Sequence, residues 1–423
     1  MATPQPPAND PPPAQKGSNY ASYQTSIYAA GLQQNHLPRV TTDPNKLEAQ
    51  AKSRLSARSY GYVAGGAGEG ATMDANRLAF RQWKIIPRML RPTPHRDLRV
   101  SLFGKTYDTP LIIAPIGVQS IFHEDKETGV AEVAAELGIP YCLSTAASSN
   151  IEEVAEASEK GREDAPRWFQ LYWPTDDEVT ISLLNRAKKN NYTVLVVTLD
   201  TFSLSWRPHD LDNAYVPFIA GIGNAIGFSD PVFRSKLAAK HSIAPEDDVL
   251  VASREWTPTA FPGVSHSWED LAFLKQHWDG PIVLKGIQHP ADAALAAHAG
   301  VHGVVVSNHG GRQVDGAIGS LEMLPEIVDA LRGTGVEVLF DSGVRTGADV
   351  VKAISLGAKG VLLGRPWCYG LAVAGKQGAS DVMKGILADI EQTLGLAGIG
   401  SISDCSASLL RRTSYGGDLA SSK

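Results

Sequence analysis

Cysteine is scarce in this chain of 423 residues. The sequence contains three, Cys142, Cys368 and Cys405, which is an odd number at wide spacing. Neither a disulfide framework nor a paired-cysteine zinc motif fits that spacing. We therefore expect reduced thiols, no metal site and an intracellular protein.

Long apolar runs and an excess of positive charge are also missing. No stretch approaches the ~20 apolar residues of a membrane span, and the first residues show no basic segment followed by an apolar one. The formal net charge of −6 leaves no basic stripe for nucleic acid or an anionic membrane. We expect a soluble protein, cytoplasmic by default, that binds neither nucleic acid nor membrane.

Composition divides the chain into four parts. Residues 1–19 are rich in proline and polar side chains, which predicts a disordered tail. Residues 20–110 are predicted to be a helical lead-in with a glycine-rich break at 65–68. The main domain is expected over 111–375, followed by a C-terminal helix and tail over 376–423.

Within the main domain, short apolar runs alternate with amphipathic helical segments, as in a parallel sheet with crossover helices. The runs cover residues 111–115, 140–145, 168–172, 194–200, 281–286, 303–309, 336–343 and 360–365. Eight units in series predict an α/β fold, a closed (β/α)8 TIM barrel rather than an open sheet.

Helices are expected between most of these runs. They cover residues 151–160, 176–189, 290–299, 321–332 and 347–356. The last is predicted to begin with a capping box formed by Thr346 and Asp349. The interval 208–264, after the fourth strand, is too long for an ordinary βα loop, so we expect a lid-like insertion over the site.

Polar side chains gather where the predicted strands end, which is where a barrel of this kind places its chemistry. They are Gln170, Tyr172, Thr198, Asp200, Lys285, Ser307, His309 and Asp341. Each alone could be a structural residue. Their coincidence on consecutive strands indicates an active site.

The segment 307–315 places His309 three residues before Arg312, with two glycines between them. Histidine can accept a proton near neutral pH, and arginine binds a carboxylate through two parallel hydrogen bonds. The segment could therefore hold a carboxylate beside a base, and the alternative is a glycine-rich loop with surface charges. The last two strands end in 341–345 and 364–365, loops that commonly form a phosphate site.

These segments together resemble the FMN-dependent L-2-hydroxy acid oxidising family. The matching stretches are 169–172, 285–286, 307–315, 340–345 and 364–365, in one order within about 46–375. Within the family, the chain is most similar to the lactate 2-monooxygenase branch, through 114–117, 206–208, the insertion and 284–290. The resemblance implies a (β/α)8 barrel that binds FMN.

The resemblance also implies roles for single residues. His309 would accept a proton from the substrate, Asp200 would stabilise the imidazolium, and Tyr172 would hydrogen-bond the reacting oxygen. The substrate carboxylate would be held by Tyr62, Arg207 and Arg312. Lys285 would lie near flavin N1 and the C2 oxygen and favour the reduced state. The implied flavin-binding residues are Pro115, Ile116, Gly117, Ser144, Gln170, Thr198, Lys285, Ser307, Asp341, Gly343, Arg345, Gly364 and Arg365.

Position 117 suggests which member of the family this chain resembles. Many members carry alanine there, and the monooxygenase branch carries glycine. A missing methyl would leave room beside flavin N5, so that keto acid and peroxide could react before either leaves; alternatively, Gly117 merely accommodates Ile116. The hypothesis is conversion of L-lactate and O2 to acetate, CO2 and water.

Two alternatives stay open. One is an oxidase or dehydrogenase of the same family, which releases the 2-keto acid with H2O2 or reduces another acceptor. The other is a phosphate-binding barrel without redox chemistry. The expected partners are a small 2-hydroxy acid, O2 and further copies of the chain in a homotetramer or homo-octamer. Substrate preference would depend on insertion residues such as Tyr215, Phe218 or Phe233.

Overall fold

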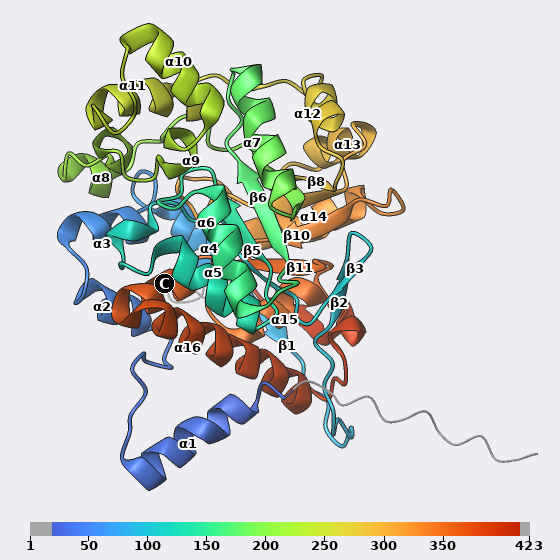
Figure 1. The fold of residues 1–423 in the computed structure, drawn as a ribbon. Helices are drawn as coiled ribbons and strands as arrows, with labels where there is room; N and C mark the ends of the chain where they lie inside the picture. The colour runs from blue at the N-terminus through green and yellow to red at the C-terminus, as the bar shows by residue number, and fades with distance from the viewer. Residues whose placement is uncertain (1–18, 415–423) are drawn as a thin grey trace, which may run out of the picture.

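A computed structural model describes residues 19–414 of the chain (Figure 1). The tail predicted for residues 1–19 lies outside this range apart from Asn19, as do the last nine residues of the predicted C-terminal tail. No helix within 19–414 is long and apolar enough to cross a membrane. No cluster of three or more His, Cys, Asp or Glu side chains in the same range could hold a metal ion.

Eight parallel strands close into a barrel, as predicted. They are β4 (Leu111–Ile113), β5 (Tyr141–Ser144), β6 (Arg167–Leu171), β7 (Tyr192–Thr198), β8 (Ile282–Ile287), β9 (Gly303–Val306), β10 (Glu337–Phe340) and β11 (Gly360–Leu363). Their order around the barrel follows the chain, and β11 pairs with β4 to close it. The strands end earlier than several predicted runs, because the last residues of those runs turn away to form the site.

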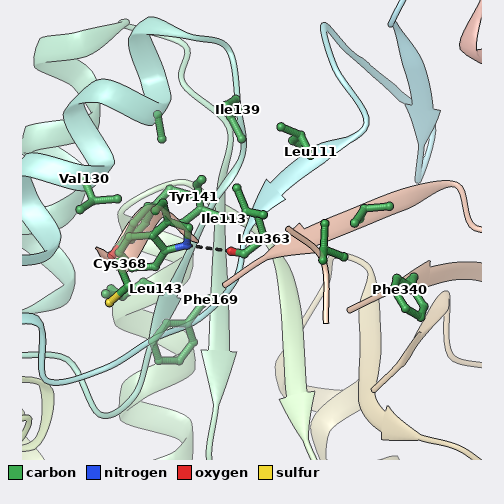
Figure 2. Packing of buried hydrophobic residues seen from close by; sticks show 14 of the residues in the cluster. Leu111, Ile113, Val130, Ile139, Tyr141, Leu143, Phe169, Phe340, Leu363 and Cys368 are labelled. Carbon is green, nitrogen blue, oxygen red and sulfur yellow. Dashed lines mark hydrogen bonds between the residues drawn. The ribbon is translucent and has the colours of Figure 1, made fainter. Parts of the chain in front are cut away.

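Both faces of the strands are buried, which explains why the sequence reads as continuous apolar runs. Ile112, Trp168 and Val305 belong to a cluster inside the barrel. Leu111, Ile113 and neighbouring residues pack outward instead, in the cluster shown in part in Figure 2.

Helices surround the barrel (Figure 1). They include α5 (Lys126–Glu136), α6 (Ile151–Gly161), α7 (Asp177–Lys189), α12 (Leu271–His277), α13 (Pro290–His298), α14 (Ser320–Ala330), α15 (Gly347–Ser355) and α16 (Arg365–Ala397). The backbone leaves helical geometry inside α16 at Ala374 and Gly375, next to the predicted boundary at 375.

The predicted capping box at α15 is only half formed. Thr346 accepts a hydrogen bond from the backbone N–H of Asp349 at 3.1 Å. The Asp349 carboxylate accepts from Arg77 and from the backbone N–H of Arg345 rather than from Thr346. A charged partner competes successfully for the carboxylate, so the reciprocal bond of the box is lost.

The lead-in is helical at first, with α1 (Ser22–Gln34), α2 (Leu47–Lys52), α3 (Ala57–Ala64) and α4 (Ala71–Gln82). It then departs from the helical prediction. β1 (Trp83–Ile85) pairs with β12 (Leu410–Arg412), and β2 (Val100–Leu102) forms a hairpin with β3 (Lys105–Tyr107). Phe103 and Tyr107 of this hairpin contact Trp168 inside the barrel, so the hairpin covers the end opposite the site.

The insertion after β7 has a helical structure of its own, at the top of Figure 1. It contains α8 (Pro208–Asp212), a 3-10 turn at Pro217–Ala220, α9 (Ala225–Phe228), α10 (Pro231–His241) and α11 (Val249–Ala260). Phe233 and Trp256 form its small core, with ring centroids 5.1 Å apart. Its aromatic side chains Phe218 and Phe261 reach the cavity at the carboxyl ends of the strands.

Candidate functional site

One cavity opens at the carboxyl ends of the barrel strands, and the space it encloses together with its open mouth is about 990 Å³. The predicted site residues that line it are Tyr62, Pro115, Ile116, Gly117, Tyr172, Arg207, Lys285, His309, Arg312, Asp341, Gly343, Arg345, Gly364 and Arg365. The structure thus brings most of the predicted site together.

His309 and Asp200 form a hydrogen-bonded pair. Nδ1 of His309 lies 2.7 Å from Oδ1 of Asp200. Thr201 donates its hydroxyl to the same carboxylate oxygen at 2.9 Å and lies 3.0 Å from Nδ1. Because a carboxylate accepts hydrogen bonds, Nδ1 carries the proton and Nε2 is the nitrogen that can act on a ligand.

The surroundings favour a neutral imidazole beside a charged carboxylate. Burial lowers the pKa of His309 below its usual 6.5, against the opposing effect of Asp200. Burial alone would raise the pKa of Asp200, but attraction to the protonated form of His309, the charge of Lys285, and hydrogen bonds from His309 and Thr201 hold it below its usual value. A neutral histidine oriented by a carboxylate is suited to act as a general base.

The backbone at His309 is strained, with φ at +56°. Left-handed backbone costs a non-glycine residue roughly 1 kcal/mol or more and persists where the surroundings enforce it. Ser342 contributes here, because its hydroxyl accepts the N–H of Gly310 at 3.0 Å and donates to Asp341 at 2.7 Å.

Lys285 is a buried cation between two carboxylates. Its Nζ lies 3.5 Å from Oδ2 of Asp341, 3.9 Å from Oδ2 of Asp200, and 3.1 Å from the Ser307 hydroxyl. Burial alone would lower its pKa, but the two carboxylates raise it above the ordinary value. The ammonium therefore stays charged at the wall of the cavity.

Arg207 and Arg312 converge on the same side of the cavity. Arg312 donates to the backbone oxygens of Tyr62 and Gly65 at 2.6 and 3.0 Å, and lies over the Tyr62 ring. Arg207 donates to the backbone oxygen of Arg312 at 3.0 Å. Burial, then the charge of Arg312, lowers the pKa of Arg207 to about 10. Asp210 acts on both guanidinium groups electrostatically, but no carboxylate among residues 19–414 forms a close ion pair with either. Two adjacent guanidinium groups of this kind favour an anionic ligand.

Arg345 and Arg365 form a second cationic region. Arg365 donates to the backbone oxygens of Val63, Gly65 and Gly310, and burial lowers its pKa to about 10. Arg345 donates to the backbone oxygen of Val344 at 2.9 Å, and burial lowers its pKa too. Neither guanidinium forms an ion pair with a carboxylate in the described part of the chain.

The same region also has exposed backbone. Gly343 has φ at +88°, and a β-carbon added to Gly364 would have a single neighbour within 4 Å, at 3.9 Å, so the backbone there faces open space. Two half-buried guanidinium groups without an ion-pair partner within the described residues, beside open backbone, are the donor set that a phosphate needs. The residues present therefore fit the phosphate end of FMN.

Five predicted site residues lie behind this surface rather than on it: Ser144, Gln170, Thr198, Asp200 and Ser307. Gln170 donates to the Thr198 hydroxyl at 2.9 Å and accepts from the backbone N–H of Thr145. Ser307 accepts from the backbone N–H of His309 at 3.1 Å. Their hydrogen bonds are thus made largely to protein, and direct contact with the flavin stays a prediction.

Gly117 lines the cavity, but its missing methyl does not open toward it. A β-carbon added there would lie 2.3 Å from the backbone oxygen of Ala146. The glycine is required by close packing of two loops. This corrects the expectation that the missing methyl provides space for the reacting molecules.

Sequence reasoning missed two residues that line the cavity, Thr201 and Phe261, and Phe261 packs against Tyr172 with ring centroids 4.8 Å apart. Of the three insertion candidates named from the sequence, Phe218 lines the cavity. Phe233 lies in the insertion core and Tyr215 packs under Arg58. Adjacency to Asp200 is a signal that could have identified Thr201.

Comparison with known proteins agrees with this geometry. A family model described as FMN-dependent dehydrogenase matches residues 51–412. The chain is 58% identical to FMN-dependent alpha-hydroxy acid dehydrogenase qulF of Penicillium citrinum, over 95% of this chain and 98% of the relative. It is 40% identical to L-lactate oxidase of Lysinibacillus sphaericus (strain C3-41), over 84% and 89% respectively. A crystal structure of mandelate oxidase superposes with a TM-score of 0.74 at 34% identity, covering 88% of this chain and 98% of that one.

Proposed function

The chain belongs to the FMN-dependent dehydrogenase family, and from this premise we propose that it oxidises a small L-2-hydroxy acid with an apolar side chain, releasing the 2-keto acid. It is an FMN-dependent oxidoreductase acting on 2-hydroxy acids. The observation that carries the proposal is the convergence of His309, Arg207 and Arg312 on one cavity.

The cavity offers FMN two kinds of contact. Arg345 and Arg365, with the open backbone at Gly364 and the backbone of Gly343 at the cavity wall, would bind the phosphate. Lys285 would face the flavin ring, where a fixed positive charge favours added electrons. Bound FMN supplies the two-electron acceptor for oxidation at C2 of the substrate.

The substrate carboxylate would bind to Arg207 and Arg312. Burial raises the pKa of the Tyr62 and Tyr172 hydroxyls, so both keep their protons and can donate hydrogen bonds. Tyr62 would donate to the carboxylate, and Tyr172 to the oxygen on C2. Fixing both groups orients the C2 carbon before reaction.

His309 would move the proton. Its Nε2 would accept a proton either from the hydroxyl group or from C2, and Asp200 would stabilise the imidazolium formed. The substrate then loses two hydrogens in total, one as this proton, while its C–O bond becomes a carbonyl. Bound FMN would be the acceptor of the two electrons and of the second hydrogen.

Part of the cavity lining is apolar. It includes Phe122, Leu204, Phe218 and Phe261. Since these side chains offer no hydrogen-bond partner, we infer that the substrate side chain is apolar, as in lactate, and that malate-like acids are rejected. The name of one relative, L-lactate oxidase, supports this inference, since lactate has a methyl side chain.

The experiment is anaerobic mixing of the yellow holoenzyme with L-lactate, glycolate, L-mandelate, L-malate and the D-isomers, followed by flavin bleaching. We expect bleaching by L-acids with apolar side chains. Lack of bleaching by every L-acid, a preference for D-isomers, or purification of a protein that binds no flavin would overturn the proposal. The last result would favour the phosphate-binding barrel without redox chemistry.

Product analysis then separates the outcomes within the family. In air with catalase present, L-lactate should give pyruvate, because catalase removes free peroxide before it can decarboxylate the product in solution. Acetate that still forms in the presence of catalase would instead support the lactate 2-monooxygenase reaction. The steric argument for that reaction, which rested on Gly117, no longer holds. Faster turnover with an added electron acceptor than with O2 would identify a dehydrogenase.

The cytoplasmic location and the assembly into a homotetramer or homo-octamer stay predictions. Light scattering of the purified protein tests the assembly.

A further inference from the structure

Helix α4, outside the barrel, contacts the loop that carries His309. We define the catalytic loop as residues 307–320. The side-chain amides of Asn76 and Asn308 pair reciprocally, because Asn76 Nδ2 donates to Asn308 Oδ1 at 2.9 Å and Asn308 Nδ2 donates to Asn76 Oδ1 at 2.7 Å. Asn76 is 2% exposed and Asn308 6%, so neither amide can exchange its partner for water.

The pair holds both ends of the catalytic loop. At the start of the loop, Asn308 Oδ1 accepts the backbone N–H of Gly311 at 3.0 Å. At its end, Asn76 Oδ1 accepts the N–H of Ser320 at 3.0 Å, and Asn308 Nδ2 donates to the backbone oxygen of Ile318 at 3.2 Å. One buried pair therefore fixes the span between those two points.

His309 lies in the turn between Asn308 and Gly311, which the Asn308 side chain closes, in left-handed backbone that it would not adopt unaided. The groups facing its imidazole are Asp200, Thr201, Lys285 and Arg207. Asn76 is not among them, so any effect of Asn76 on the imidazole must pass through Asn308 and the backbone.

The same turn of α4 also supports the phosphate end of the cavity. A β-carbon at Gly343 would lie 2.9 Å from the β-carbon of Asn76, and Arg77 donates to the backbone oxygen of Gly343. Asn76 thus lies where α4, the catalytic loop and the loop of Gly343 meet.

We propose that Asn76 is a positioning residue that fixes the catalytic loop so that His309 reaches both Asp200 and the substrate. This inference rests on the proposed function of His309 as the base. It gives the lead-in a role in the reaction besides supplying Tyr62.

The test compares N76A and N76D with D74N, a control on an exposed position of the same helix. Turnover is expressed per bound flavin, so that loss of folded protein does not count. A misplacement of about 1 Å can cost about 10²-fold in rate, and we expect a loss of that order in kcat for both Asn76 variants at neutral pH. KM should change by less than about threefold, since the Arg312 guanidinium is anchored on the backbone oxygens of Tyr62 and Gly65, outside the catalytic loop.

Two readouts separate positioning from a merely structural role. Amide hydrogen exchange within 307–320 should accelerate in N76A, with and without flavin, since the N–H groups of Gly311 and Ser320 lose their fixed acceptors. In N76D, a protonated carboxyl group can donate to Asn308 Oδ1 and restore the pair. The rate of N76D relative to wild type should therefore recover as the pH falls, whereas that of N76A should not. N76D is isosteric and keeps the test decisive should N76A fail to fold.

The inference is overturned when the Asn76 variants turn over within twofold of D74N per bound flavin, or when exchange in the loop is unchanged. H309Q distinguishes this failure from failure of the proposed function. If H309Q is active, His309 is not the base and the proposed function fails. If H309Q is inactive while the Asn76 variants are normal, only the positioning role of Asn76 fails.

Discussion

A β-carbon on Gly117 would lie 2.3 Å from the backbone oxygen of Ala146. The loops after β4 and β5 are therefore in tight contact at these two residues. Adding a methyl there overpacks a buried site, which costs about 1–3 kcal/mol. We predict that G117A lowers the thermal stability of the protein and leaves the ratio of acetate to pyruvate unchanged. Its control is G385A, because Gly385 is helical with open space around its β-carbon position, and alanine should stabilise it slightly. A G117A enzyme that is as stable as wild type but gives a different ratio of acetate to pyruvate would support the hypothesis that the missing methyl leaves room for the reacting molecules.

The pH profile should report His309. A base must be unprotonated, and burial lowers the pKa of this imidazole, so kcat/KM should fall on the acid side only below pH 6.5. D200N removes the charge that raises the pKa of His309. We therefore expect the acid limb to move to still lower pH, and the plateau to fall by about 10²–10⁴-fold as stabilisation of the imidazolium is lost. An acid limb that moves upward in D200N would contradict this assignment.

Arg345 should discriminate FMN from riboflavin, which lacks the phosphate. Hydrogen bonds to charged groups contribute about 1.5–3 kcal/mol each, so R345M should weaken FMN binding by about 10–100-fold. Riboflavin affinity should hold or improve, since the variant also removes a buried unpaired charge. Fluorescence titration of flavin-free protein with both ligands measures the ratio. An equal loss for both ligands would place the phosphate elsewhere.

Phe261 should limit the size of the substrate side chain. It reaches the cavity from the end of α11 and packs on Tyr172 and Phe218. F261A removes this wall, and we expect kcat/KM for L-mandelate relative to L-lactate to rise by about tenfold or more. F233L is the matched control, because Phe233 lies in the insertion core, where a change should affect stability rather than preference. A ratio that responds equally to both variants would exclude a direct role for Phe261.

The barrel could be predicted from sequence because buried parallel strands leave a local signal. The hairpin of β2 and β3 leaves no such signal. Its strands are three residues long, and Lys105 and Thr106 are exposed. It forms because Phe103 and Tyr107 pack on Trp168 at the barrel end, a tertiary contact that composition does not reveal.

The same distinction between local sequence signals and tertiary contacts applies to the residues of the site. Residues at strand ends, such as Lys285 and His309, could be found because topology alone brings strand ends together. Phe261 could not, since the path of the insertion decides where it lies. The steric role of Gly117 also depends on a neighbour in another loop, Ala146, which no pattern in the sequence identifies.

The bonds between the lead-in and the cavity join distant parts of the chain. Asn76 and Asn308 are 232 residues apart, Tyr62 and Arg312 are 250 apart, and Val63 and Arg365 are 302 apart. During synthesis, helices α3 and α4 therefore leave the ribosome long before their partners exist, and closing such long loops is slow. The binding pocket is thus completed only after residues 308–365 have been made, so a chain truncated before them has no complete place for its cofactor.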